Sequence, residues 1–344
     1  MINIGVIGCG YWGPNLIRNF ESLSGVNMYM AAEINENKLK QIQENYPRII
    51  ATTDYTEIIK NPKIDAVAIA TPAFSHAKLA IEALENNKHV FVEKPFAISI
   101  KQAEQMNLTA KKYNKILMAG HIFEYTVAVR KIKEIIESGE LGEIYYISCQ
   151  RLNLGLFQQD INVIWDLAPH DVSVILYLLG KEPLKVLASG ASHINPNVED
   201  VSILTMEFEN NLIAYIHNSW LDPNKIRKMT IVGSKKMLVY DDVEPTEKIK
   251  IYYKGVDVPA HYETFGEFPY SYFYGDIVIP MLKNTEPLKT ELSHFRDCII
   301  NGSQPDSNGE SGLRVVKVLE AANESIKNNS QKIDIKNFYQ TKKL

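Results

Sequence analysis

Short apolar runs alternate with amphipathic stretches through the first 120 residues, and this alternation restricts the possible fold more than any other feature. Runs of this length are typical of buried strands, and the stretches between them have helical spacing. Alternating strands and helices with short connections predict an α/β fold with a doubly wound parallel sheet. The expected strands lie at 2–7, 26–32, 64–70, 88–92 and 116–120, with a weaker one at 49–51.

Two of the intervening stretches carry helix signals of their own. Residues 76–87 place Ala77, Ala80, Ile81 and Leu84 on one face, as an amphipathic helix requires. In the next stretch, Ser99 precedes Gln102 by three residues, a spacing that predicts a capping box at a helix start.

The pattern changes after Gly120. A helix at about 127–138 precedes a series of strand-like runs, some joined by tight polar turns such as 209–211, which indicates an antiparallel meander. Two late helices follow at about 288–301 and 311–328. We therefore expect a second, α+β domain with a large open mixed or antiparallel sheet. Its expected strands are 143–153, 184–194, 201–208, 212–221, 226–233 and 235–241.

The length of 344 residues suits two domains. The change of pattern predicts a first domain at 1–120, a second domain at 121–330 and a polar tail at 331–344.

Composition excludes several classes of function. A formal charge of −4 without long basic runs argues against a nucleic-acid or membrane-surface partner. The N-terminus lacks the basic and apolar regions of a signal peptide, and no apolar run is long enough to span a membrane. Three scattered cysteines form no disulfide framework or zinc pattern, and the eight histidines show no metal-binding pair. We expect a cytoplasmic protein without a structural metal.

A glycine motif follows the first expected strand. Gly8, Gly10 and Gly13 form GxGxxG between a strand and a helix, with Tyr11 and Trp12 inside the motif and Pro14 just after it. That context favours dinucleotide binding, because the glycines allow a tight turn and close approach of a pyrophosphate. The helix N-terminus offers unpaired N–H groups to the anion.

Glu33 ends the second expected strand, 20 residues beyond Gly13, where an acid can accept hydrogen bonds from an adenosine ribose. A carboxylate there repels a 2′-phosphate, so we expect NAD rather than NADP. The other interpretation is a solvated acid at a helix cap. Thr71 and Pro72 end the fourth strand at the same edge, and His76 opens the next helix, either at the cofactor or as a capping or surface residue.

Glu93, Lys94 and Pro95 come directly after the strand at 88–92. A lysine at the carboxyl end of a central strand points toward the cofactor crevice, and Pro95 restricts the backbone that presents it. Such a lysine can bind a substrate hydroxyl and stabilise developing oxyanion charge. The alternative is an exposed loop lysine.

Residues 165–171, WDLAPHD, begin another expected helix, which runs to Leu179. Proline is tolerated in a first helical turn, so Asp166 is a plausible N-cap, with His170 in that turn or just past it. A positive helix end would favour the neutral imidazole that a general base needs. The alternative is a capping aspartate and a buried structural histidine.

These motifs, taken in order, resemble the Gfo/Idh/MocA oxidoreductases over nearly the whole chain. The resemblance is carried by GCGYWG, by 64–67 with Thr71, Pro72 and His76, by HVFVEKP and by WDLAPHD. Further support comes from 138–142, from 286–288 and from the late helix near Gly312. The resemblance implies an N-terminal Rossmann domain, and a C-terminal sheet that commonly forms the interface of homodimers or homotetramers.

The resemblance also implies roles for these residues in hydride transfer between NAD and a sugar or cyclitol hydroxyl. Lys94 would touch the reacting hydroxyl, and His170 would act as acid or base with Asp166 beside it. GYWGPNL, WDLAPHDVS and the run from Ser219 to Arg227 most resemble nucleotide-sugar 3-dehydrogenases, which oxidise the 3-hydroxyl of a UDP-N-acetylglucosamine-type sugar. The expected cofactor contacts also include Glu93 and Trp165, and the expected sugar contacts are Tyr125, Arg151, Asn153, Gln158 and His170.

Two other functions fit the sequence. One keeps the chemistry but changes the substrate to an inositol or another sugar, or reverses it to reduce a 3-keto sugar. The other is a non-catalytic NAD-binding regulator, because one fold can serve several functions. The presence of Lys94, Asp166 and His170 together favours an enzyme.

Overall fold

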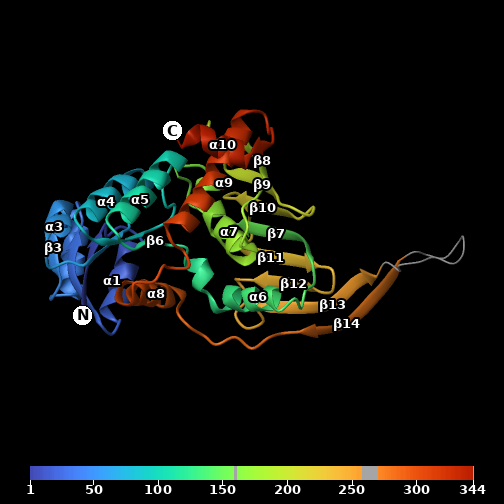
Figure 1. Ribbon diagram of the computed structural model, residues 1–344, viewed down its shortest axis with the longest axis horizontal. Coiled ribbons are helices and arrows are strands. Elements are labelled where there is room, and N and C mark those ends of the chain that lie inside the picture. The colour runs from blue at the N-terminus through green and yellow to red at the C-terminus, as the bar shows by residue number, and fades with distance from the viewer. Residues whose placement is uncertain (159–160, 258–269, 344) are drawn as a thin grey trace, which may run out of the picture. The chain divides into compact units, whose positions relative to one another are not determined.

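The computed structural model describes residues 1–158, 161–257 and 270–343 (Figure 1). They form two compact units. The first contains residues 1–126 together with 285–320 and 337–344, and the second contains 127–284 and 321–336. No helix within the described ranges has both the length and the apolarity needed to cross a bilayer.

The first unit is built on six parallel strands in the order β3-β2-β1-β4-β5-β6. This confirms the doubly wound sheet that the apolar runs predict. The order reverses between β1 and β4, which is where such sheets bind ligands at their carboxyl edge. The strands are β1 (Ile2–Ile7), β2 (Val26–Ala32), β3 (Ile50–Thr52), β4 (Ala66–Ile69), β5 (His89–Val92) and β6 (Leu117–Ala119).

The helices between these strands start at residues that suit a helix N-terminus. Asn35 and Asp54 accept backbone N–H groups at the starts of α2 and α3. Ser99 caps α5 through the Gln102 N–H, as predicted, but the Gln102 side chain accepts from the Ile98 N–H instead of closing the box. The elements are α1 (Gly13–Glu21), α2 (Glu36–Asn45), α3 (Tyr55–Lys60), α4 (Ala73–Glu85), α5 (Ile100–Lys112) and the 3-10 helix η1 (Ile122–Tyr125).

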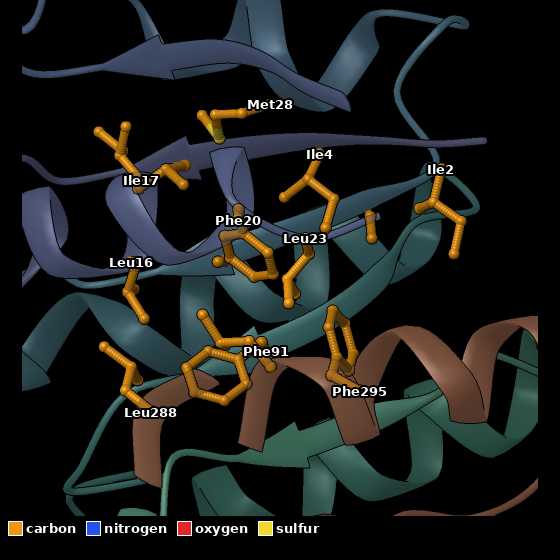
Figure 2. Packing of buried hydrophobic residues seen from close by; sticks show 14 of the residues in the cluster. Ile2, Ile4, Leu16, Ile17, Phe20, Leu23, Met28, Phe91, Leu288 and Phe295 are labelled. Atoms are coloured by element: carbon orange, nitrogen blue, oxygen red, sulfur yellow. The ribbon is translucent and has the colours of Figure 1, made fainter. Parts of the chain in front are cut away.

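Helix α8 (Pro287–Asn301) completes the core of the first unit although it lies far along the chain. Figure 2 shows Leu288 and Phe295 of α8 among the side chains of β1, α1 and β5. The rings of Phe295 and Phe91 meet edge to face, with centroids 5.9 Å apart. Burial of side chains of this size stabilises the unit by about 1.5–3 kcal/mol each.

The predicted domain limits differ from this division. The helix at 288–301 is present, but it packs with the first unit and not with the second domain to which 121–330 was assigned. Helix α9 (Gly309–Lys327) contributes to both units. The predicted tail contains β15 (Ile333–Asp334) and α10 (Ile335–Lys342).

The second unit contains a nine-stranded sheet in the order β14-β13-β12-β11-β7-β10-β9-β8-β15. The predicted meander is wrong at its centre, because β7 pairs in parallel with β10 and antiparallel only with β11. A parallel pair needs a crossover connection, and helix α7 (Val163–Leu179) follows β7. The strands are β7 (Ile144–Leu152), β8 (Lys185–Ala191), β9 (Val201–Glu207), β10 (Ile213–Ser219), β11 (Ile226–Gly233), β12 (Met237–Asp241), β13 (Ile249–Asp257) and β14 (Ser271–Val278). The last two have no counterpart in the prediction.

Helix α7 covers one face of this sheet through contacts with β7, β9 and β10, and it also contacts α6 (Val127–Glu137). The opposite face exposes large apolar side chains at alternate positions of three neighbouring strands. We call this set the outer sheet face: Tyr146, Ile203, Ile213 and Tyr215, each 39–42% exposed.

Candidate active site

The glycine turn between β1 and α1 shows why each glycine is needed. Gly8 has a φ of +94°, and a Cβ there would lie 2.7 Å from the Ala70 carbonyl oxygen. A Cβ on Gly13 would lie 2.0 Å from the Gly8 oxygen. Gly10 differs, since a Cβ there meets nothing within 4 Å. The turn therefore needs Gly8 and Gly13 for its own packing, and Gly10 leaves open space beside the backbone.

That open space lies at the start of α1, where the described residues give the first turn no side-chain cap. Unpaired N–H groups at a helix start attract an anion. The turn fits a dinucleotide pyrophosphate, because the space beside Gly10 is open to a ligand. An added methyl group at Gly10 would fill that space without disturbing the fold.

We expect Gly10→Ala to leave the fold intact and to lower NAD affinity at least about tenfold, equivalent to about 1.4 kcal/mol. Thermal denaturation should show a melting temperature close to that of the parent, and fluorescence titration should show the weaker binding. Gly13→Ala is the matched comparison, and its steric conflict with Gly8 should lower the melting temperature. A Gly10→Ala variant that binds NAD normally would contradict this assignment.

Glu33 connects the end of β2 to the glycine turn. Its Oε2 accepts the Cys9 N–H at 2.7 Å, and its Oε1 accepts the Asn35 N–H at 3.0 Å. The carboxylate therefore lies beside the turn, as an adenosine-ribose acceptor should. Burial, reinforced by the Glu33 charge, raises the pKa of the Cys9 thiol to about 12, so Cys9 is a packing residue and not a nucleophile.

His76 lies between two turns at the edge of the first sheet. Its side chain is buried, with Nδ1 2.9 Å from the Pro95 carbonyl oxygen and Nε2 2.7 Å from that of Thr71. Burial lowers the pKa of the His76 imidazole, against the effect of these two carbonyls. The predicted cofactor contact is corrected on this ground: His76 instead joins the turn after β4 to the turn after β5, and Pro72 lies at the N-cap of α4 between them.

The turn after β5 presents Lys94. The Lys94–Pro95 peptide bond is cis, and the Lys94 N–H lies 3.3 Å from Oε2 of Glu93. Desolvation raises the pKa of Glu93 to about 7, against the opposing amide and charge of Lys94. Because β5 is parallel to β1, Lys94 leaves the sheet at the same edge as the glycine turn.

Helix α7 carries the second predicted constellation, but it begins earlier than predicted. Asn162 is the N-cap, and its Oδ1 accepts the Trp165 N–H at 3.2 Å. Asp166 is therefore not the cap, and Pro169 and His170 lie inside the helix. The expected effect of the positive helix end on His170 is wrong for this reason, since the dipole acts mainly on the first turn.

Asp166 and His170 lie one turn apart on α7, a spacing that places side chains on the same face. The Trp220 Nε1–H donates to Oδ2 of Asp166 at 3.0 Å, and the Trp220 side chain is buried. Trp165 is also buried, and its backbone N–H is held by the Asn162 side chain. The second unit therefore fixes the orientation of the Asp166 carboxylate one turn before His170.

Two predicted sugar contacts are corrected by the structure. Arg151 forms a buried pair with Asp171, with Nε–Oδ2 at 2.7 Å and Nη2–Oδ1 at 3.0 Å. Tyr125 is 1% exposed, and its hydroxyl lies 3.0 Å from Oγ of Ser307. Both side chains are used inside their own units, so neither is offered to a ligand. Arg151 instead anchors the residue that follows His170.

Asn153 and Gln158 follow β7 and stay predicted contacts. The Asn153 N–H donates to the Ser219 carbonyl at 3.2 Å, and Gln158 Nε2 donates to the Leu156 carbonyl at 3.2 Å.

Sequence reasoning missed Asn162, Trp220 as the partner of Asp166, and Asp171 as the partner of Arg151. An Asn three residues before Trp165 is a cap signal that could have been recognised.

Two family models match the chain. The model described as an oxidoreductase family with an NAD-binding Rossmann fold matches residues 2–121, and the Gfo/Idh/MocA C-terminal domain model matches residues 129–239. The chain belongs to the Gfo/Idh/MocA family. It is therefore an NAD-dependent oxidoreductase.

Individual proteins of known name are similar over almost the full length. Myo-inositol 2-dehydrogenase from Thermotoga maritima is 24% identical, covering 94% of this chain and 96% of its own. UDP-N-acetylglucosamine 3-dehydrogenase GnnA from Acidithiobacillus ferrooxidans superposes with a TM-score of 0.79 at 22% identity, covering 96% and 99%. An oxidoreductase from Agrobacterium radiobacter, solved with NAD+, L-tartaric acid and magnesium, gives 0.80 at 19%, covering 98% and 99%. At these identities the structural likeness shows the fold.

Proposed function

We propose that this protein oxidises a secondary hydroxyl of a UDP-N-acetylhexosamine or its uronate, at C3, to a 3-keto sugar with NAD+. The observation that carries the proposal is the position of Lys94, which leaves β5 at the sheet edge that also bears the glycine turn and Glu33. The motifs at 165–171 and 219–221 support the choice of a nucleotide sugar.

The first unit would hold the cofactor. The amides of the glycine turn bind the pyrophosphate, and Glu33 accepts hydrogen bonds from the adenosine ribose. A carboxylate has about four lone-pair positions, so Glu33 can keep its bonds to Cys9 and Asn35 at the same time. Its charge repels a 2′-phosphate, which favours NAD over NADP. Bound NAD+ supplies the hydride acceptor for the reaction.

The proton and the oxygen charge are handled by His170 and Lys94. His170 accepts the hydroxyl proton as the carbon-bound hydrogen departs, and the Lys94 ammonium stabilises the negative charge that develops on the oxygen. Asp166, held by the Trp220 indole, orients the imidazole. Neither Lys94 nor His170 can replace the other, since Lys94 stabilises charge on the oxygen and His170 must exchange a proton.

An inositol is the second candidate substrate, favoured by the full-length similarity to myo-inositol 2-dehydrogenase. A 3-keto sugar reductase would use the same residues in reverse. A non-catalytic regulator is disfavoured, because a regulator has no need of Lys94, Asp166 and His170 together.

The test is NADH formation, followed by near-ultraviolet absorbance, with a panel of UDP-hexosamines, UDP-hexosaminuronates, free hexoses and inositols. A coupled aminotransferase or a 2-oxo acid keeps the assay informative when NADH stays bound. Turnover confined to UDP-sugars supports the proposal and identifies the sugar. Turnover of inositols or free sugars alone replaces the substrate but keeps the chemistry, and NAD binding without any turnover favours a reductase or a regulator.

We also propose that the outer sheet face binds a second copy of the chain, in a reducing cytoplasm where Cys9, Cys149 and Cys298 stay free thiols. Tyr146 and Tyr215 stack on this face with ring centroids 6.5 Å apart, and Ile213 is paired with Tyr146 across the strands. An apolar patch on neighbouring strands is typical of an interaction surface.

Light scattering should therefore give the mass of a dimer or tetramer, and Tyr215→Glu should lower it by placing a charge inside the interface. Tyr145→Glu is the matched control. Tyr145 is 52% exposed on β7, but as the neighbour of Tyr146 in the strand it lies on the other face of the sheet. A monomeric parent protein would contradict the proposed interface.

A further inference from the structure

Three glutamates of the first unit gather beside the turn that presents Lys94. Glu93 follows β5, Glu124 lies in η1, and Glu291 lies in α8, which contacts η1. A Cβ on Gly120 would lie 3.2 Å from Oε2 of Glu93, so the Glu93 carboxyl rests against the end of β6. Glu124 and Glu291 are at most 1% exposed, whereas Glu93 is only partly buried. We call Glu93, Glu124 and Glu291 the buried acid cluster.

The cluster has too few hydrogen-bond donors for three carboxylates. His121 Nδ1 lies 3.1 Å from Oε1 of Glu124. Among the described residues, both carboxyl oxygens of Glu291, Oε2 of Glu124 and Nε2 of His121 have no hydrogen-bond partner. An ionised carboxylate buried without donors is costly, whereas a protonated carboxyl is tolerated.

The charged and titratable neighbours fall short of neutralising the cluster. Lys94 and the Trp12 indole lower the pKa of Glu93, against the larger effect of desolvation, and His121 contacts Glu124. The Tyr125 phenol, against which the His294 ring packs, is kept neutral, since burial and the charges of Glu291 and Glu124 raise its pKa. Burial and the charges of Glu93 and Glu124 likewise raise the pKa of Glu291 well above its usual range. At neutral pH the cluster therefore carries protons that ordinary glutamates would have lost.

The position of the cluster points to the nicotinamide end of the cofactor. The pyrophosphate belongs at the turn after β1, and Glu33 places the adenosine on the β2 side of that turn. In a doubly wound sheet the other half of the dinucleotide then lies over the ends of β4 and β5. Glu93 stands at the end of β5. The nicotinamide ring is cationic in NAD+ and neutral in NADH, so the charge beside the cluster changes with the redox state.

We propose that the buried acid cluster releases a proton when NAD+ binds and takes a proton up when the cofactor becomes NADH. The proposal rests on the NAD-dependent oxidation proposed above and adds a proton-holding group to it. In one turnover the substrate C–H bond breaks and its electron pair goes with the hydrogen to the nicotinamide. The hydroxyl proton goes to His170 and from there to solvent, and the cluster takes one proton from solvent as the ring loses its positive charge. That proton returns to solvent when the next NAD+ binds.

The sign of the pH dependence follows from this exchange. A positive ring favours the ionised carboxyls, so NAD+ binding lowers the pKa values of Glu93 and Glu291 and releases a proton. Raising the pH must therefore strengthen NAD+ binding. The pKa of Glu93, raised to about 7, sets the range in which this happens. NADH lacks the ring charge, and its affinity should stay within about twofold between about pH 6 and pH 8.

Proton release is measured with a pH-indicator dye in weakly buffered enzyme titrated with NAD+ or NADH, without any sugar. Near neutral pH we expect about half a proton or more per bound NAD+, and less than about one-fifth per NADH. Because the two ligands differ only at the nicotinamide, equal release by both would overturn the proposal. Absence of sugar oxidation in a separate assay would overturn the proposed function but not this proton exchange. The failure of one proposal can therefore be told from the failure of the other.

Glu291→Gln removes one carboxyl of the cluster while keeping its shape, and it should reduce the NAD+-linked release to about half or less. Glu85→Gln is the control, since Glu85 is an exposed acid of the same unit, and its release should match the parent protein. Glu124→Gln replaces Glu291→Gln when the latter does not fold. Parent-like release from a folded cluster variant would overturn the assignment to these three residues.

Discussion

Lys94→Ala should lower kcat by at least about 10²-fold while NAD binding stays near that of the parent. The substitution removes the cation that stabilises the developing oxygen charge in the transition state. In the proposed function NAD is bound mainly by the glycine turn and Glu33, which stand at other strand ends of the same sheet. The measurement is steady-state NADH formation on the substrate identified by the panel, with NAD affinity determined separately by fluorescence.

The pattern of kinetic constants separates a catalytic role from a structural one. Loss of a transition-state contact lowers kcat, whereas loss of uniform binding raises KM alone. Lys63→Ala, which removes an exposed lysine of the same unit, should leave both constants unchanged. A Lys94→Ala variant that keeps its kcat and raises only KM would show that Lys94 binds substrate without stabilising the oxygen charge.

His170→Asn should also lower kcat by at least about 10²-fold, because Asn occupies a similar position but cannot exchange a proton. The parent rate should rise with pH as the imidazole loses its proton, and this rise should disappear in the variant. The pH profile of kcat/KM therefore distinguishes a base from a residue that merely shapes the helix.

His193→Asn serves as the control for this variant, since His193 is a half-exposed histidine of the same unit that contacts Asp200. It should keep both the rate and the pH profile. Turnover near that of the parent in His170→Asn would exclude His170 as the base and direct attention to another proton acceptor.

The sequence predicts the first sheet well for a physical reason. Parallel strands are covered on both faces, so each one appears as a short, uninterrupted apolar run such as 64–70 or 88–92. The glycine motif is also recognisable from sequence, because nearby backbone leaves no room for a side chain at Gly8 or Gly13. A Cβ on Gly13 would meet Gly8, and a Cβ on Gly8 would meet the backbone at Ala70, directly after β4.

Features that depend on distant residues are the ones that sequence reasoning misses. The amphipathic pattern of 288–301 identifies a helix but not the sheet it covers, and in the structure α8 belongs to the first unit. From sequence, Arg151 and Tyr125 both look available to a sugar. In the structure, the Arg151 guanidinium is paired with Asp171 and the Tyr125 hydroxyl contacts Ser307. Polar side chains carry no local sign of whether the fold has already paired them.

Hydride transfer from C3 of the sugar to NAD+ is the central claim, and transfer of a deuterium label tests it most directly. UDP-N-acetylglucosamine carrying deuterium at C3 is incubated with the enzyme and NAD+, and the reduced cofactor is analysed by mass spectrometry. We predict that the deuterium appears on the nicotinamide, together with a slower rate of turnover than with the unlabelled sugar. Reduced cofactor that carries no deuterium would contradict oxidation at C3.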